Sequence, residues 1–272
     1  MIWRVGDFIR NQFTKSPTHQ FTNFAIHYEF RVVRRRPFGV STRLYQHLRL
    51  TREHLAEIAA HGFETVELVA SPTHVDYRNP SAVADLQQWL AEARLELRSV
   101  QAPVGAQAPD DIEQALFIAR RIPIEVFVTR TEGTRDTVRR GIERIAELAR
   151  PLGVHVAVEA GPDDASPPGS LVHLVEDEID SDESGIGIGL DFGREQRRGD
   201  LVDAIETVAE HLIAVRVPLE SSIDWPSALT TVQKIGYEGP LVFDLEARGS
   251  TRETLARART AREKMERWLT ST

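Results

Sequence analysis

The chain has 272 residues, a net charge of −8 and no cysteine, so it is long enough to bury a large core and offers neither disulfides nor thiolate metal sites. No apolar run approaches the roughly 18 residues of a membrane span and no secretory signal is visible, so we expect a cytoplasmic protein with no membrane partner. The acidic composition is a poor match for nucleic-acid binding and suits a small-molecule enzyme or a cation site.

The first 37 residues differ in composition from the rest. They carry seven Lys or Arg and two acids, hold five of the eleven phenylalanines, and end in Arg34-Arg35-Arg36-Pro37. A basic, acid-poor segment is compatible with a targeting arm, whereas the plainer interpretation, which we favour, is a loosely attached extension. The predicted organisation is an N-terminal extension over 1–37 and one domain over 38–272.

From Phe38 onward the sequence alternates between strand and helix patterns. The predicted strands are short apolar runs at 38–43, 63–69, 97–101, 124–129, 154–159, 186–191, 212–217 and 241–246. N-cap residues and an apolar period of 3.6 residues indicate helices between them. These helices cover 51–61 and 80–93, begin near Asp110, cover 134–152, begin at Ser170, cover 200–211, begin at Asp224, and finish the chain with Leu255, Ala258, Ala261, Met265 and Trp268 on one face.

Eight strand–helix units in strict alternation predict a parallel sheet closed into a single (β/α)8 barrel, an α/β fold whose active site lies at the carboxyl ends of the strands. A doubly wound open sheet is the alternative. That fold often carries a glycine-rich loop that opens a helix, whereas Gly185, Gly187 and Gly189 lie at or inside a predicted strand. The sequence therefore favours the barrel.

Charged side chains end several strands on the face that points into the barrel. Because strand side chains alternate between faces, the inward carboxylates are Glu67, Glu159, Asp191 and Asp244. Glu246 lies one step further along strand eight, and Arg194 and Arg216 supply two positive charges. Five carboxylates against two guanidinium groups leave three uncompensated negative charges, which indicates a bound cation, raised carboxyl pKa values, or acids turned away from the mouth.

Several short motifs lie at or near the predicted strand ends from residue 38 onward. They are VSTRLY at 40–45, IAAHGFETVEL at 58–68, HVDY at 74–77, SVQAP at 99–103, VAVE at 156–159, LDFG at 190–193 followed by Gly199-Asp200, IDW at 223–225, and GYEGPLVFD at 236–244. In this order and placement they resemble the xylose-isomerase-like sugar phosphate isomerases and epimerases. The resemblance implies a TIM barrel that acts on a small carbohydrate.

The resemblance also implies a divalent metal at the mouth, held by a Glu ending strand five, an Asp ending strand six, a His ending strand seven and a Glu ending strand eight. By position, Glu159, Asp191 and Asp244 would be its ligands here, an all-oxygen set that suits Mg²⁺ or Mn²⁺. Glu159, Asp244 and Glu246 would move the proton between adjacent carbons.

Three family histidines are replaced in this sequence. Arg216 stands in place of the strand-seven ligand and cannot coordinate a metal, because a guanidinium has donors and no available lone pair. Gln101 stands in place of the strand-three histidine, and Arg194 in place of the histidine after the strand-six Asp. Part of the family's metal site is therefore replaced.

Two hypotheses stay open. In the first, the protein is an isomerase or epimerase assisted by Mg²⁺ or Mn²⁺. Its substrate contacts would be Glu67, His74, Gln101, Arg194 and Arg216, with the two arginines holding a phosphate or carboxylate. In the second, Arg216 has displaced the metal and bonds Glu159 and Asp191, and the barrel binds a small anionic or sugar ligand without turnover or does metal-free chemistry.

A third reading, an abasic-site endonuclease, requires a His-rich zinc mouth and a basic DNA face. The sequence shows neither, so no nucleic-acid partner is expected. Barrels of this kind often dimerise, and a homodimer is compatible with the sequence.

Overall fold

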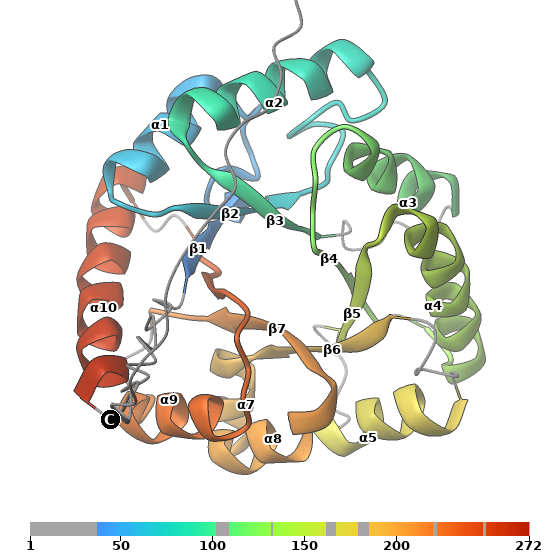
Figure 1. Ribbon diagram of the computed structural model, residues 1–272, viewed down its shortest axis with the longest axis vertical. Coiled ribbons are helices and arrows are strands. Elements are labelled where there is room, and N and C mark those ends of the chain that lie inside the picture. Colours follow the sequence, from blue (N-terminus) through green and yellow to red (C-terminus); the bar gives the residue numbers. More distant parts are fainter. Residues whose placement is uncertain are drawn as a thin grey trace, which may run out of the picture. The chain divides into compact units, whose positions relative to one another are not determined.

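Eight parallel strands form a closed barrel in the computed structural model, with neighbours in the order β1 to β8 and β8 paired back to β1. The structure describes residues 37–101, 109–131, 133–161, 167–178, 185–219, 222–246 and 249–271. Figure 1 shows the ring of strands with the helices outside it. The (β/α)8 prediction is confirmed. The predicted extension, except Pro37, lies outside the described residues, so its boundary and role stay predictions.

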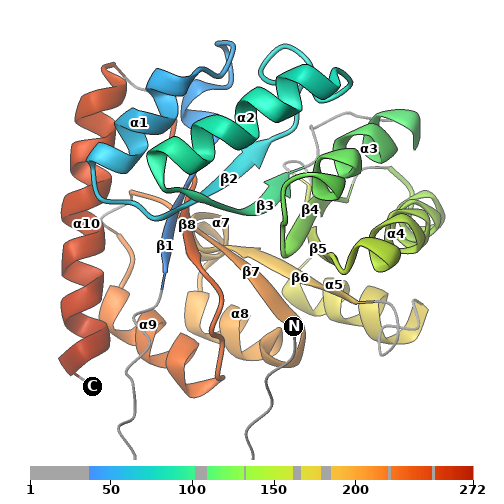
Figure 2. The ribbon, with the colours of Figure 1, turned by 45° about the horizontal axis from the view of Figure 1, so that its top comes forward.

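The strands of the barrel are β1 (Phe38–Ser41), β2 (Thr65–Val69), β3 (Glu96–Gln101), β4 (Val126–Arg130), β5 (His155–Glu159), β6 (Ile186–Asp191), β7 (Leu212–Val217) and β8 (Leu241–Phe243). The helices are α1 (Arg52–Ala60), α2 (Pro80–Ala93), α3 (Pro109–Leu116), α4 (Arg135–Ala149), α5 (Pro168–His173), α7 (Phe192–Arg198), α8 (Leu201–Thr207), α9 (Trp225–Lys234) and α10 (Thr251–Ser271). Figure 2 shows the same elements turned by 45°.

Local capping explains why several helices begin where the sequence predicts. Asn79 accepts a hydrogen bond from the backbone N–H of Ser81 and Pro80 opens α2, while Thr134 accepts one from the N–H of Thr137 at the start of α4. These bonds lie within three residues of each cap, so sequence alone indicates them.

One helix was not predicted. α7 follows β6 directly, and Asp191 is its N-cap, with its Oδ1 accepting the backbone N–H of Arg194 at 3.1 Å. Gly199, at φ +139°, then separates α7 from α8. The predicted single helix over 200–211 is therefore α8 followed by a short 3-10 turn, Ala209–His211.

Two strands end earlier than predicted. β1 ends at Ser41, and the chain continues as a 3-10 turn, Thr42–Tyr45, capped by the Ser41 hydroxyl. β8 ends at Phe243, and the N–H of Asp244 still donates to the carbonyl of Val217. Arg43 therefore lies on a 3-10 turn, and Asp244 lies on irregular chain rather than on regular strand.

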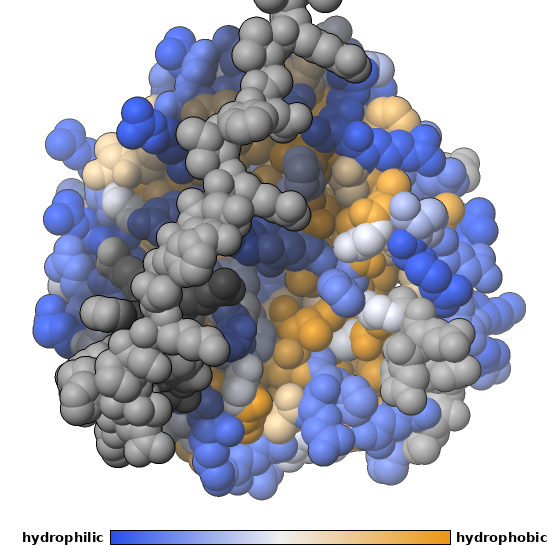
Figure 3. All heavy atoms as spheres, in the orientation of Figure 1, coloured by the Kyte–Doolittle hydropathy of each residue, from blue (hydrophilic) through white to orange (hydrophobic). Residues whose placement is uncertain are grey.

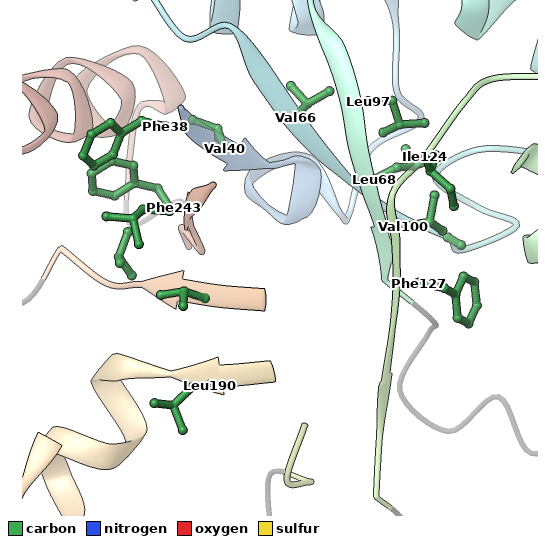
Figure 4. Close-up of a cluster of buried hydrophobic side chains, with 14 of the residues drawn as sticks. Phe38, Val40, Val66, Leu68, Leu97, Val100, Ile124, Phe127, Leu190 and Phe243 are labelled. Carbon is green, nitrogen blue, oxygen red and sulfur yellow. The ribbon is translucent and has the colours of Figure 1, made fainter. Parts of the chain in front are cut away.

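The core lies between the outward faces of the strands and the helices that cover them (Figure 4). The rings of Phe38 and Phe243, from neighbouring strands, stack with centroids 6.2 Å apart. Along α10, Leu255, Ala258 and Met265 are buried at helical spacing, as predicted. In Figure 3 hydrophilic residues dominate the outer rim and hydrophobic residues gather further in. No helix in the described part of the chain has the length and apolarity of a membrane span.

Candidate active site

Arg216, on β7, is the centre of a buried ion network inside the barrel. Its side chain is 2% exposed. Nη1 and Nη2 donate to the two carboxylate oxygens of Glu67 at 2.6 and 2.9 Å, and Nε donates to Oε1 of Glu159. This is the bidentate geometry in which a guanidinium binds a carboxylate most strongly. All three side-chain nitrogens donate to carboxylates, so Arg216 holds two buried acids together, and its predicted contact with substrate stays a prediction.

Two further arginines, which are not among the predicted site residues, belong to the same network. Arg43, just after β1, donates from Nη1 to Oδ2 of Asp244 at 3.0 Å. Arg130, the last residue of β4, donates from Nε to Oε2 of Glu159 at 3.3 Å. The signal was a basic residue at the end of a predicted strand, since Arg43 ends the predicted strand 38–43 and Arg130 directly follows the predicted strand 124–129. The charge count from the sequence included only the basic residues on strand seven and after strand six.

The network removes the charge deficit expected from the sequence. Four carboxylates, Glu67, Glu159, Asp191 and Asp244, lie at or below the mouth with an equal number of guanidinium groups, Arg43, Arg130, Arg194 and Arg216. Three of each are bonded to one another in the network, whereas Asp191 and Arg194 are not. The fifth predicted acid, Glu246, is exposed. The positive charge that a mouth of clustered acids requires is therefore supplied by the chain itself.

Glu67 lies below the mouth. It is 2% exposed, two residues before the end of β2, and its Oε2 also accepts a hydrogen bond from Ser99 Oγ at 3.1 Å. Burial raises its pKa, and the neighbouring Arg216 opposes that rise. Glu67 was predicted to contact substrate, whereas the structure places it as the buried anchor of Arg216.

Asp191 is the mouth carboxylate that the arginines leave free. Its Oδ1 caps α7, and among the described residues no Lys or Arg side chain forms an ion pair with it. Burial raises its pKa above the ordinary value. The guanidinium of Arg194, three residues on, donates instead to the carbonyls of Ala160 and Gly161 and so fixes the chain just after β5.

Two small cavities lie on either side of the network. One, of about 20 Å³, opens at the tops of β5 and β6 and is lined by Arg130, Glu159, Asp191 and Arg194, among others. The other, of about 60 Å³, is lined by Glu67, Ser99, Glu159 and Arg216 and extends toward the opposite end of the barrel. Both have room for water. The segments after β3, β5, β7 and β8, at 102–108, 162–166, 220–221 and 247–248, lie outside the described residues.

His74 and Gln101, the remaining predicted substrate contacts, are buried. Gln101 is 2% exposed at the end of β3. His74 is 0% exposed, and its Nδ1–H donates to the carbonyl of Leu48 at 2.7 Å. Its Nε2 is buried without a partner among the described residues. His74 therefore stabilises the loop after β1 through this hydrogen bond. A contact with substrate stays a prediction for both His74 and Gln101.

The buried imidazole of His74 predicts a pH dependence of stability. Burial lowers its pKa below the ordinary 6.5, so as pH falls below 6.5 the unfolded chain takes up a proton that the folded chain does not. Stability should fall by up to about 1.4 kcal/mol per pH unit until the folded pKa is reached. Urea unfolding between pH 7.5 and 5.5 should give a flatter profile for His74→Gln than for wild type. The exposed His47→Gln should keep the wild-type slope, and parallel profiles for His74→Gln and wild type would contradict this account.

Gly189 makes room for Glu159. A Cβ at this position on β6 would lie 2.7 Å from Cγ of Glu159, whose carboxylate is held by two guanidinium groups. Gly189→Ala should therefore destabilise the protein by about 1–3 kcal/mol in urea unfolding. The matched control is Gly141→Ala in α4, where an added Cβ meets nothing within 4 Å; it should stabilise the helix by about 0.5–1 kcal/mol. Equal effects of the two substitutions would show that Glu159 is free to move.

The predicted metal ligands do not fit a divalent ion as arranged. Among the described residues, the one group of Asp, Glu or His whose ligand atoms all lie within 4.8 Å of one another is Glu176, Glu210 and His211, away from the mouth. Glu159, Asp191 and Asp244 do not bring one oxygen each that close. Both oxygens of Glu159 accept from guanidinium groups instead.

The second hypothesis from the sequence is corrected in one detail. Arg216 does bond Glu159, but its other carboxylate partner is Glu67, not Asp191. The reason is that the two side chains point in different directions inside the barrel. Asp191 is the in-register neighbour of Arg216 on β6, yet its carboxylate turns to cap α7, while the guanidinium reaches across to β2.

Several solved structures are similar to this barrel. A D-tagatose 3-epimerase-like protein is 21% identical, with a TM-score of 0.72 over 86% of this chain and 98% of that one. A xylose isomerase domain protein from Planctomyces limnophilus is 14% identical, with a TM-score of 0.68 over 87% and 98% of the two chains. A xylose isomerase-like TIM barrel protein from Mycobacterium smegmatis, in complex with magnesium, is 16% identical, with a TM-score of 0.68 over 86% and 97%. At these identities the similarity shows the fold.

The sequence comparisons name the family. No curated protein matches the sequence significantly. The family model described as xylose isomerase-like TIM barrel matches residues 55–272, which is most of the chain and includes every predicted site residue. The chain belongs to the xylose isomerase-like TIM barrel family.

Proposed function

We propose that this barrel binds a small carbohydrate at its mouth and moves a proton between adjacent carbons, as an isomerase or epimerase. The observation that carries the proposal is the pair of carboxylates on either side of Arg216. Asp191, on β6, contacts no side-chain cation among the described residues, and Oδ1 of Asp244, after β8, has no hydrogen-bond partner among them. Titratable groups with unused oxygens at the C-terminal mouth of a barrel are candidates for proton transfer.

The two aspartates have distinct tasks in this proposal. One removes a proton from the carbon beside the substrate's carbonyl, and the other returns a proton to the neighbouring carbon or to the opposite face. Between these two proton transfers, negative charge develops on the substrate oxygens of the enediolate. Arg43, which is 23% exposed beside Asp244, would stabilise that charge, whereas both carboxylate oxygens of Glu159 already accept hydrogen bonds from arginines.

The names of similar structures support a ketose as the first substrate class to test. They include the D-tagatose 3-epimerase-like protein and a D-psicose 3-epimerase crystallised in the presence of D-fructose, which is 15% identical to this chain. A cysteine-free chain also suits a reducing compartment, and we propose the cytoplasm.

Proton NMR in D₂O tests the reaction directly. The purified protein is incubated with D-tagatose, D-psicose, D-fructose and their phosphates, and loss of the C–H signals next to the carbonyl is followed. Time-dependent deuterium incorporation that scales with protein concentration is expected for at least one sugar. No incorporation with any of them contradicts the proposed reaction on this substrate class.

The second candidate function is ligand binding without turnover. It is favoured by the observation that Glu159, a catalytic carboxylate by resemblance, has both oxygens bonded to arginines. Ligand-detected NMR on the same samples separates the two candidates. Saturation transfer to a sugar that exchanges no deuterium supports a binding barrel, whereas binding with exchange supports the isomerase.

A further inference from the structure

We infer that the guanidinium of Arg216 replaces the divalent metal ion that the family resemblance implies, so that the mouth is assembled without a metal. This inference concerns the state of the site and does not depend on the proposed reaction. It rests on the position of Arg216, on the oxygens that are already bonded, and on the charge of the mouth.

The position of Arg216 is the first ground. Its Nε bonds Glu159, and its Nη1 lies 3.8 Å from Oδ2 of Asp244. The guanidinium thus lies between two of the three carboxylates that the resemblance assigns to the metal. Asp191, the third, is the in-register neighbour of Arg216 on β6, so the cation occupies the space that these side chains would share around an ion.

The bonded oxygens are the second ground. Both oxygens of Glu159 and Oδ2 of Asp244 accept from arginines, and Oδ1 of Asp191 accepts a backbone N–H. A metal would have to displace several charge-assisted hydrogen bonds, which are about twice as strong as neutral ones. The free energy gained by coordinating the metal would be reduced by the loss of these hydrogen bonds.

Charge is the third ground. The four mouth carboxylates are already balanced by four guanidinium groups, and Arg216 is 2% exposed. Adding a divalent metal ion would leave an excess of buried positive charge, which is unfavourable in a medium of low dielectric constant. A metal is therefore neither needed to neutralise the acids nor easily accommodated beside Arg216.

Metal titration of the full-length protein tests this inference. The protein is dialysed against EDTA and titrated with Mn²⁺, with the free ion followed by its electron paramagnetic resonance signal and binding by calorimetry. Wild type should bind no stoichiometric Mn²⁺ at micromolar concentrations, and EDTA should leave the melting temperature unchanged. Tight stoichiometric binding that is lost in Asp191→Asn would overturn the inference. Binding lost in Glu176→Gln and retained in Asp191→Asn belongs to the exposed Glu176 cluster and leaves the inference standing.

The converse variant is Arg216→His/Glu67→Gln, which offers an imidazole ligand and removes the carboxylate that the arginine would leave unpaired. If the variant is folded by circular dichroism, its Mn²⁺ affinity should exceed that of wild type by about tenfold or more. A folded variant with no gain in affinity counts against Arg216 as the metal's replacement. The wild-type titration decides the question even where the variant does not fold.

Discussion

Arg216→Met should cost about 3–5 kcal/mol of unfolding free energy, because it leaves Glu67 and Glu159 buried without their shared counter-charge. The two carboxylates are 3% and 4% exposed, so water cannot replace the guanidinium. Urea unfolding followed by circular dichroism measures the loss. A change below about 1 kcal/mol would mean that the network contributes little.

The control for this prediction separates a lost arginine from a lost network. Arg98, on β3, pairs with Glu96 and Glu125 near the surface at 32% exposure, so Arg98→Met should cost at most about 1 kcal/mol. Adding Glu67→Gln to Arg216→Met should recover part of the stability, since one uncompensated buried charge is removed. If Glu67→Gln instead has the same effect in wild type and in the variant, the two residues are not coupled.

Asp191→Asn should lower the rate of deuterium exchange into substrate by about 10²–10⁴ while leaving the fold intact. Asn lacks the titratable carboxylate but keeps an Oδ1 that can accept the N–H of Arg194, so the cap of α7 is preserved. The rate is measured by proton NMR in D₂O, relative to wild type. The matched control is Asp203→Asn on the exposed face of α8, which should exchange at the wild-type rate.

The same substitution should not lower stability at neutral pH. Burial raises the pKa of Asp191, so between its ordinary and its folded pKa the folded state binds more protons than the unfolded state. The contribution of Asp191 to stability is therefore greatest below the ordinary value of 3.8 and is lost as pH rises through the pKa of the folded state. Asn has no carboxyl group to ionise, so the variant does not suffer this loss of stability. Urea unfolding at pH 7.5 should show that Asp191→Asn is as stable as wild type or more stable. A variant that is both inactive and destabilised would indicate a structural role for Asp191 instead.

The order of the elements and the inward register of the charged residues follow from the amino-acid sequence alone. β6 and β7 begin and end where the apolar runs predicted, and α2 begins at its predicted cap, because strand alternation and helix capping depend on near neighbours. The same alternation placed Glu67, Glu159, Asp191 and Arg216 inside the barrel.

The pairing of each acid with its arginine depends on the closed barrel and cannot be predicted from the sequence. Arg216 and Glu67 are 149 residues apart, and Arg43 and Asp244 are 201 residues apart. Their pairing depends on how far the closed barrel staggers one strand against the next and on which way each long side chain turns. The hydrophobic period and the spacing of residues along the chain do not contain that information. The sequence therefore indicated a surplus of acids at the mouth, where the fold adds two more arginines.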